Sequence, residues 1–440
     1  MRGEASDEGF GRNWRSLQLC PLWRGVCARA IGLGQKLRDS LPAKGLVNDI
    51  AAHVPFRVPF LDLKAQYSGI REETNAAVLH VLETASFVGG PVVETFEHEF
   101  AALVGAKYCV GVANGTDAIT LSARAAGLGP GDEVLVPANS FFASAEAISN
   151  AGATPVFVDV DPATFHMDPE RAAEAVTDRT RAMVAVHLYG RAMNMKPFET
   201  LASKHNLVII EDCAQAHGAA MDGDTVGASG RLTCYSFYPG KNLGAYGDGG
   251  AVTTSDPDLM RRLRILRDHG SPGKYEHSVV GWNSRLDALQ AAVLSVKLPY
   301  LHRWNASRRR LANKLAAALA DSPVIPPAIL EGKQHVFHLF VVRCSRRDEL
   351  KHFLDEMGIQ TGIHYPVPLH LTAAYQSLGA PRRGSKPVTE SLSSQILSLP
   401  IYPELSDEQM GYIISALRQF IENNHLSAPM DFTVSERASV

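Results

Sequence analysis

Short apolar runs alternate with longer amphipathic stretches through the middle of the chain. The runs have the length of strands, and between them apolar side chains recur every three or four residues, the period of a helix. This pattern predicts strands at 133–136, 155–158, 181–187 and 207–211 and helices at 143–151, 169–176 and 196–204. Because parallel strands are joined by crossover helices, the alternation favours an α/β fold whose mainly parallel sheet carries helices on both faces.

The sequence on either side of this region predicts further elements. Helical periodicity covers 67–84 and 92–104, and a long amphipathic pattern over 286–311 contains Pro299, where we expect the helix to bend. The C-terminal part predicts strands at 336–342 and 360–364 and helices at 347–357 and 407–422. We therefore expect a small C-terminal α/β domain after the large one.

The expected domain organisation has four parts. Residues 1–57 form an N-terminal extension that we expect to be poorly ordered, because its charged residues interrupt every apolar run. A large domain at 58–300 and a small domain at 301–424 follow, and 425–440 is a polar tail. Its pattern predicts neither a classical signal peptide nor a membrane span.

Composition narrows the class of protein. The chain has 440 residues, 45% of them hydrophobic and 20% charged, which is typical of a globular protein with a large core. A net charge of −3 gives no electrostatic reason to expect nucleic acid as a partner. The six cysteines lack metal-ligand spacing, and we expect no metal, reduced thiols and a cytoplasmic location.

Lys241 lies in a glycine-rich turn between two predicted strands, 232–238 and 251–254. An ammonium removed from water has a lowered pKa, and the neutral amine can then attack a carbonyl. A lysine of this kind forms Schiff bases, whereas an ordinary lysine of a mobile loop does not. If Lys241 binds an aldehyde cofactor such as pyridoxal 5'-phosphate, the sequence should also supply an acid for the ring nitrogen, phosphate donors and a stacking group.

The acid is expected at the end of the strand at 207–211. Open α/β sheets bind ligands at the carboxyl ends of their strands, and Asp212 lies at such an end, so that its carboxylate can keep the pyridine nitrogen protonated. Glu211 should point to the opposite face. Gln215 and His217 follow on the exit loop, where either can reach the ring oxygen or the substrate, although His217 can equally be a packed core imidazole.

Phosphate donors are expected where the chain enters the helix at 118–126. The residues that lead into it, among them Gly115 and Thr116, place free N–H groups of the helix N-terminus where an anion can bind, although a plain helix cap explains the same residues. Ser236 precedes the lysine turn and can add a hydroxyl. Phe141 or Phe142 can stack on the ring, and the other belongs to the core.

Five ordered motifs carry a family resemblance. They are Asn-Gly-Thr-Asp-Ala at 114–118, Pro-Ala-Asn-Ser-Phe at 137–141, Glu-Asp-Cys-Ala-Gln-Ala-His-Gly at 211–218, Ser-Phe-Tyr-Pro-Gly-Lys-Asn-Leu-Gly at 236–244 and Asn-Ser-Arg-Leu-Asp-Ala-Leu-Gln-Ala-Ala at 283–292. In these motifs the chain resembles the DegT/DnrJ/EryC1/StrS family of pyridoxal-phosphate-dependent sugar aminotransferases, over about residues 58–422. The resemblance implies fold-type I, with a mainly parallel seven-stranded sheet.

The same resemblance implies roles for individual residues. Lys241 becomes the Schiff-base lysine and proton carrier, and Asp212 the partner of the pyridine nitrogen. The other implied cofactor contacts are Gln215 at the ring oxygen, Phe141 on the ring, and Gly115, Thr116 and Ser236 at the phosphate. Asn283 would reach the phosphate from a second subunit, which implies a homodimer with shared sites.

For the substrates, the resemblance implies L-glutamate as amino donor and a nucleotide-linked keto-sugar as acceptor, in a ping-pong reaction. The segment 362–370 resembles the mouth of the active site in such enzymes, although it can also be a rigid packing loop. The candidate substrate contacts are Tyr189, His217, His364, Tyr365 and His370, with Tyr246 as a further wall residue.

Two alternatives remain open. A different fold-type I enzyme acting on small amino acids would need a reactive cysteine, or an arginine that clamps a carboxylate, for which Arg285 is the candidate within a motif. A non-catalytic regulatory relative would be expected to have lost the lysine or the aspartate, and both are present.

Overall fold

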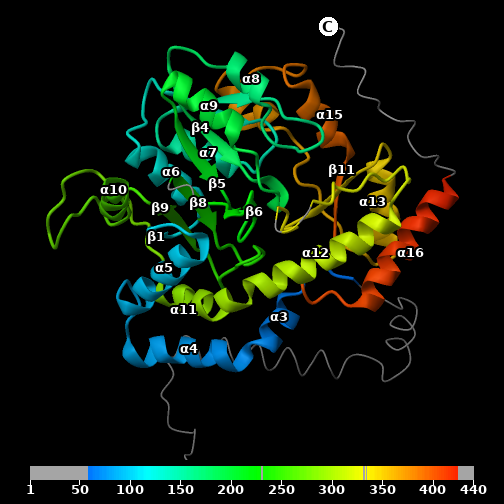
Figure 1. The fold of residues 1–440 in the computed structure, drawn as a ribbon, viewed down its shortest axis with the longest axis horizontal. Coiled ribbons are helices and arrows are strands. Elements are labelled where there is room, and N and C mark those ends of the chain that lie inside the picture. Colours follow the sequence, from blue (N-terminus) through cyan, green and yellow to red (C-terminus); the bar gives the residue numbers. More distant parts are fainter. Residues whose placement is uncertain (1–57, 229–230, 331, 333, 425–440) are drawn as a thin grey trace, which may run out of the picture. The chain divides into compact units, whose positions relative to one another are not determined.

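The computed structural model describes residues 58–424 except 229, 230, 331 and 333, so the expectations for 1–57 and 425–440 lie outside the described residues. Its centre is a seven-stranded sheet with the strand order β1-β9-β8-β5-β4-β2-β3 (Figure 1). The strands are β1 (Tyr108–Val112), β2 (Glu133–Pro137), β3 (Thr154–Val158), β4 (Thr180–Val186), β5 (Val208–Asp212), β8 (Leu232–Ser236) and β9 (Gly250–Thr254). Only β9 runs antiparallel to its neighbours, which confirms the mainly parallel sheet.

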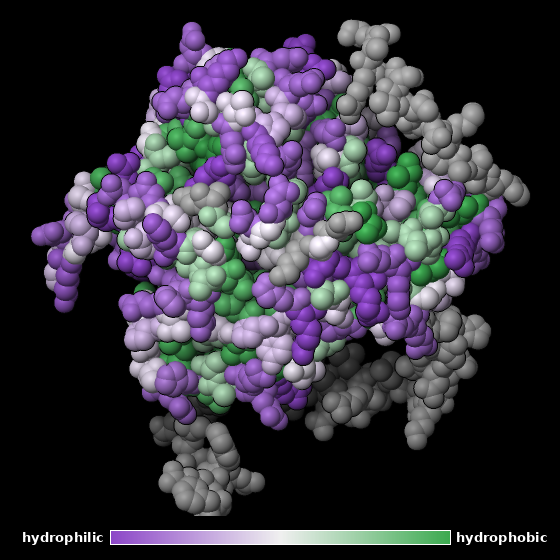
Figure 2. Space-filling model, in the orientation of Figure 1, coloured by the Kyte–Doolittle hydropathy of each residue, from purple (hydrophilic) through white to green (hydrophobic). Residues whose placement is uncertain are grey.

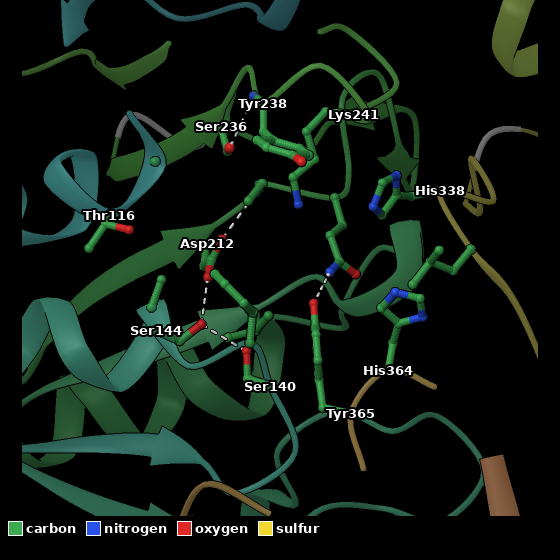
Figure 3. Close-up of a pocket in the computed structure, with 18 of the residues that line it drawn as sticks. Thr116, Ser140, Ser144, Asp212, Ser236, Tyr238, Lys241, His338, His364 and Tyr365 are labelled. Carbon is green, nitrogen blue, oxygen red and sulfur yellow. Dashed lines mark hydrogen bonds between the residues drawn. The ribbon is translucent and has the colours of Figure 1, made fainter. Parts of the chain in front are cut away.

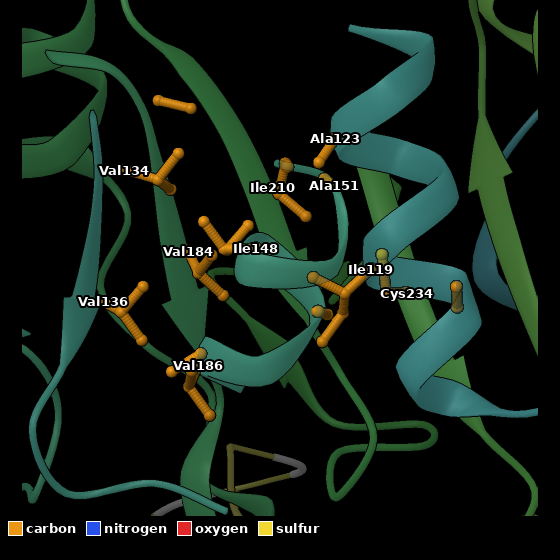
Figure 4. Close-up of a cluster of buried hydrophobic side chains, with 14 of the residues drawn as sticks. Ile119, Ala123, Val134, Val136, Ile148, Ala151, Val184, Val186, Ile210 and Cys234 are labelled. Atoms are coloured by element: carbon orange, nitrogen blue, oxygen red, sulfur yellow. The ribbon is translucent and has the colours of Figure 1, made fainter. Parts of the chain in front are cut away.

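Both faces of the sheet are apolar because successive side chains point to opposite sides. On one face Val134, Val184 and Ile210 pack with Ile119 of α6 (Gly115–Ala125) and Ile148 of α7 (Ala143–Asn150), as Figure 4 shows. On the other face the adjacent residues of the same strands, Leu135, Met183 and Ile209, pack with side chains of α8 (Pro169–Glu174) and α9 (Lys196–His205). The predicted three-layer arrangement is therefore confirmed.

Five further helices among the described residues belong to the N-terminal two thirds of the chain. They are α3 (Leu63–Gly69), α4 (Arg71–Thr84), α5 (Pro91–Val104), α10 (Pro257–Arg267) and α11 (Ala288–Lys297). The predicted helix at 67–84 is in fact two helices, because the backbone leaves the helical conformation at Ile70. The predicted bend at Pro299 is confirmed: a 3-10 turn at Leu298–Tyr300 joins α11 to α12 (Leu301–Ala318).

The C-terminal part packs its own core around a two-stranded antiparallel sheet. The sheet consists of β10 (Phe340–Arg343) and β11 (Ile396–Leu399), and the helices are α13 (Arg347–Glu356), α14 (Ala373–Ser377), α15 (Pro387–Gln395) and α16 (Asp407–Asn423). The division of the chain at residue 300 remains a prediction, because the described residues on both sides of it belong to one compact unit. Two short strands, Ala220–Met221 and Asp224–Thr225, form a separate hairpin.

Two strand predictions in this part are wrong. The predicted strand 336–342 begins only at Phe340, because Phe337 has a φ of 45°, which a strand does not accommodate. The segment 360–364 forms a single bridge between Gly362 and Ser398 and then turns into the wall of a cavity. The true partner strand, β11, was not predicted from the sequence.

The described surface is mostly polar, with hydrophobic patches between the polar side chains on the face shown in Figure 2. Within residues 58–424, none of the described helices has the length and apolar character needed to cross a membrane.

Candidate active site

A cavity of about 670 Å³ lies where β5 and β8 end and α6 begins (Figure 3). Asp212 and Ser236, the last residues of the two strands, line one side of it. His338 and His364 of the C-terminal part line the opposite side. The carboxyl ends of parallel strands are where open α/β sheets bind ligands, so the position alone marks a candidate site.

Lys241 lies at the wall of this cavity, in the turn between β8 and β9, as the sequence predicted. Its N–H donates to the carbonyl of Tyr238 at 2.8 Å, which closes a tight turn and turns the side chain into the cavity. Burial lowers the pKa of the Lys241 amine to about 8, and the negative charge of Asp212 limits the fall. A substantial fraction of the amine is therefore neutral and nucleophilic near physiological pH.

A second lysine supports the turn that contains Lys241, which we call the lysine turn. Lys297 of α11 is fully buried, and its Nζ donates to the carbonyl of Gly244 at 2.7 Å while lying 4.0 Å from the ring centre of Tyr246. Burial lowers the pKa of Lys297 to about 7. Tyr246, a predicted wall residue, thus packs on Lys297 and does not line the cavity.

Asp212 is buried at the end of β5 and is held by two donors. The hydroxyl of Ser144 donates to Oδ2 at 2.8 Å, and the N–H of Ala214 donates to Oδ1 at 3.1 Å. Ser140 lies 2.8 Å from the hydroxyl of Ser144 and extends this buried chain (Figure 3). The carboxylate is therefore fixed in orientation while it faces the cavity.

Glu211 points away from the cavity, as predicted, and pairs with His187, whose Nε2 lies 3.1 Å from Oε2. These two residues and Cys213 place potential metal ligands within 4.8 Å of one another. However, the Nδ1 of His187 accepts from the N–H of Met193 at 3.0 Å, so its Nε2 carries the proton that bonds to Glu211. Both nitrogens of this imidazole are thus used in protein contacts.

The residues predicted to bind the phosphate lie together between α6 and β8. Asn114 caps α6 by accepting from the N–H of Asp117 at 2.8 Å, which leaves the N–H groups of Gly115 and Thr116 without intrahelical acceptors. Gly115 lies so close to β8 that an added Cβ would stand 2.6 Å from the Cβ of Ser236. Gly115, Thr116 and Ser236 line the cavity together, as predicted.

Four further predicted residues also line the cavity: Phe141, Gln215, His364 and Tyr365. Gln215 donates to the hydroxyl of Tyr365 at 3.0 Å, and the Phe141 ring, which is 53% exposed, lies 5.5 Å from the Tyr365 ring. Burial, with a smaller effect of Lys241, lowers the pKa of His364 to about 4. The core role expected for one of the two phenylalanines belongs to Phe142, which packs on Tyr375.

Four predicted residues do not line the cavity of this chain. Tyr189 lies behind the wall, where its hydroxyl donates to the carbonyl of His364. His217 is fully buried beside Tyr235, and His370 is fully buried against Glu390, with Nε2 3.1 Å from Oε1. Asn283 is exposed. Three of the five substrate candidates thus lie outside the cavity of this chain, and their contact with a substrate remains a prediction.

The structure also adds residues that sequence reasoning missed. The cavity is also lined by His338, Arg308 and Ser144. Asn242 does not line the cavity, but its side chain contacts His338. A polar histidine within the apolar run 336–342 was the available sign for His338. Nothing in the sequence pattern distinguished Arg308 from its two arginine neighbours.

These residues fit pyridoxal 5'-phosphate. The amine of Lys241 can bind an aldehyde, and Asp212 is a buried carboxylate that faces the cavity without a cation in an ion pair among the described residues. The backbone at Gly115, which we call the phosphate cradle, leaves no room for a side chain and presents N–H groups that a phosphate can bind.

Comparison with curated proteins gives relatives that cover most of the chain. A dTDP-3-amino-3,4,6-trideoxy-alpha-D-glucose transaminase of Streptomyces venezuelae is 49% identical over 369 residues, 83% of this chain and 97% of the relative. A dTDP-3-amino-3,6-dideoxy-alpha-D-galactopyranose transaminase of Aneurinibacillus thermoaerophilus is 46% identical over 363 residues, 82% and 99% of the two chains. A "pleiotropic regulatory protein" of Geobacillus stearothermophilus is 46% identical over 366 residues, 82% and 98%.

Among solved structures, S. venezuelae DesV in complex with a ketimine intermediate matches with a TM-score of 0.82 and 48% identity, over 83% of this chain and 99% of that one. The model of the DegT/DnrJ/EryC1/StrS aminotransferase family matches residues 68–418. This match spans the sheet, the lysine turn and most of the C-terminal part. The chain belongs to the DegT/DnrJ/EryC1/StrS aminotransferase family.

Proposed function

We propose that the protein transfers an amino group from L-glutamate to the keto group of a nucleotide-linked sugar, with pyridoxal 5'-phosphate as the carrier. The observation that carries the proposal is the convergence of Lys241 and Asp212 on one cavity beside the phosphate cradle. Bound there, the cofactor withdraws electrons from the substrate carbon attached to nitrogen. The two substrates use the same site in turn, which makes the reaction ping-pong.

Each residue has a distinct task in this proposal. Lys241 would hold the cofactor through Nζ, and its neutral amine can accept and move the proton from the α-carbon of the amino acid. Asp212, fixed by Ser144, keeps a proton on the ring nitrogen. The phosphate binds to Gly115, Thr116 and Ser236. Phe141 would stack on the ring, and Gln215, which lines the same wall as Tyr365, would contact the ring oxygen.

The carbon that receives nitrogen is C3 of the sugar in this proposal. Both of the transaminases compared above are named for 3-amino sugars linked to dTDP. Their identities of 49% and 46% extend over almost their full length. Residues of the cavity come from both parts of the chain, and a match over 82–83% of the chain extends into both parts.

A homodimer with shared sites is part of the proposal. Asn283, expected to reach a phosphate across the interface, is exposed and lies outside its own chain's cavity. Large exposed apolar side chains lie on α4 and its exit and in the loop at 270–281: Leu79, Leu82, Phe87, Val88, Tyr275, Val279 and Val280. Such surfaces are typical of interfaces. Analytical ultracentrifugation tests this, and a monomer at micromolar concentration would contradict it.

A cytoplasmic location is also proposed. The four cysteines among the described residues are buried free thiols. Reduced thiols are the rule in the cytosol, which supports this location. Fractionation of cells expressing the full chain tests it, and recovery with the membranes or the medium would contradict it.

The alternatives receive less support from the site. A desulfurase needs an accessible thiolate, whereas burial raises the pKa of Cys213 and Cys234. Arg285, the candidate carboxylate clamp, pairs with Asp268 at 2.6 Å and lies outside the cavity. One relative is named as a regulatory protein, but a non-catalytic role would be expected to go with the loss of Lys241 or Asp212, and both line the cavity of this chain.

The test is the absorbance spectrum of the purified protein with pyridoxal phosphate, before and after addition of L-glutamate. We expect a band near the visible edge that glutamate bleaches in the wild-type protein. The Lys241→Ala variant should not lose its band through turnover. A nucleotide-linked 3-keto-sugar should then restore the band. A wild-type protein that binds no chromophore, or whose band is unchanged by any amino acid, would refute the proposed function.

A further inference from the structure

His338 lies in the wall of the cavity, on the side opposite Asp212 and next to the lysine turn (Figure 3). Its Nδ1 lies 3.2 Å from the Oδ1 of Asn242, the residue that follows Lys241 in the chain. Neither residue has a task in the amino transfer proposed above. The contacts of Asn242 determine which nitrogen of His338 carries the proton.

The orientation of the Asn242 amide is fixed by main-chain carbonyls. Its NH2 group donates to the carbonyl of Val336 at 3.0 Å and to the Oδ1 of Asn305 at 2.8 Å. The NH2 group of Asn305 in turn donates to the carbonyl of His217 at 2.8 Å. Carbonyl oxygens only accept, so neither amide can be reversed without breaking this buried chain. Oxygen Oδ1 of Asn242 therefore faces His338.

It follows that His338 carries its proton on Nδ1 and donates it to Asn242. Nε2 then has a free lone pair, and no hydrogen bond from the described residues reaches it. The charged and titratable groups around the ring are Lys241, Arg308, His364 and His217, and together with burial they hold the pKa of His338 well below its usual value. The ring is neutral, and at the cavity its Nε2 is an acceptor only.

An acceptor of this kind discriminates between the two substrates of the proposed reaction. L-Glutamate offers carboxylates, which are themselves acceptors, and an amino group that is consumed by the reaction. A sugar offers hydroxyl groups, which donate. Once a bound substrate excludes water from the cavity, a lone pair that finds no donor is left unpaired, and this makes the loss of a hydroxyl costly.

We propose that Nε2 of His338 accepts a hydrogen bond from a hydroxyl of the sugar substrate and thereby selects the sugar in the second half-reaction. The inference rests on the proposed function and adds a specificity-determining residue to it. The hydroxyl nearest the reacting C3 on either side is the 2- or the 4-hydroxyl, and the experiment distinguishes these two.

The test uses His338→Asn in the holoenzyme, because the shorter amide can still donate to Asn242 but has no atom at the Nε2 position. The half-reactions are followed separately by absorbance. One uses L-glutamate, and the other uses dTDP-3-amino-3,4,6-trideoxy-glucose or dTDP-3-amino-3,6-dideoxy-galactose as amino donor in the reverse direction. We expect kcat/KM for an amino sugar to fall about 10- to 100-fold and that for glutamate less than about 2-fold.

The first amino sugar lacks the 4-hydroxyl and the second keeps it. A loss with both assigns the contact to the 2-hydroxyl, and a loss with the second alone assigns it to the 4-hydroxyl. His338→Gln, whose longer amide can place an oxygen near Nε2, should retain more of the sugar reaction than His338→Asn. His335→Asn is the matched control, since His335 is buried three residues away and outside the cavity.

Four results would overturn the inference. Equal losses in both half-reactions would show that His338 acts through Lys241, and no loss in either would show that it has no role. Equal effects in His335→Asn would mean that the segment is only structural. Wild-type protein that reacts with glutamate but with neither amino sugar would refute the proposed substrate, and this inference with it, independently of any variant.

Discussion

The close approach of α6 to β8 gives a sharp test of the phosphate cradle. In Gly115→Ala the new Cβ would stand 2.6 Å from the Cβ and 3.1 Å from the Cα of Ser236. Ordinary carbon contacts lie at about 3.5–4.0 Å, so the start of the helix must move by roughly 1 Å. The substitution is otherwise favourable in a helix, because alanine has the higher propensity. Any loss therefore measures the clash.

The magnitude follows from the packing. Overpacking of a buried contact costs about 1–3 kcal/mol. With an unfolding entropy of about 2.1 cal/mol/K per residue over 440 residues, each kcal/mol lowers Tm by roughly 1 °C. A displaced N–H donor also loses a charge-assisted hydrogen bond of about 1.5–3 kcal/mol, which corresponds to a roughly 10- to 100-fold weaker affinity for pyridoxal phosphate.

The assay is differential scanning fluorimetry of the cofactor-free protein, together with titration of pyridoxal phosphate. Two controls accompany it. Ser236→Gly removes the atom of closest approach, so the double variant Gly115→Ala/Ser236→Gly should recover Tm relative to Gly115→Ala. Gly411→Ala in α16 adds a Cβ that meets nothing within 4 Å and should leave Tm equal or higher. A Gly115→Ala variant with unchanged Tm and cofactor affinity would refute the reasoning.

Two further predictions concern the lysines. The rate at which the cofactor-free protein captures pyridoxal phosphate should rise with pH around a midpoint near 8, because burial lowers the Lys241 pKa to about 8 and only the neutral amine attacks; a stopped-flow profile that is flat between about pH 6.5 and 9.5 would contradict this. Lys297→Met leaves the Gly244 carbonyl without its donor, at a cost of about 1–3 kcal/mol in the free energy of unfolding. Because the Lys297 pKa is lowered from 10.5 to about 7, the unfolded chain binds more protons between these pH values and wild-type stability rises with pH there. The variant lacks this rise, so chemical denaturation should show a larger loss of unfolding free energy at pH 9 than at pH 6. An equal loss at the two pH values would show that burial does not lower the Lys297 pKa in this way.

Local patterns of the sequence predicted the architecture and the centre of the site. Strand and helix periods give the parallel sheet, since each buried strand has to be apolar on both faces. Lys241 and Asp212 could be found because each sits at the end of an apolar run, where a polar side chain meets the ligand edge of a sheet. The missed strand β11 and the shortened β10 show the limit, because a two-stranded sheet pairs segments whose partner the sequence does not specify.

The tertiary structure decided which polar residues surround that centre. His217 and His370 stand in motifs beside the site, yet both are buried in packing contacts, whereas His338 comes from an apolar run and reaches the cavity. The proton position on His338 depends on a chain of amides from Asn242 to Asn305, which are 63 residues apart. Sequence patterns thus determine the fold and the chemistry of single residues, because these depend on local periodicity. Which side chains converge, and which lone pair is left free, depends on long-range packing, and only the folded chain decides it.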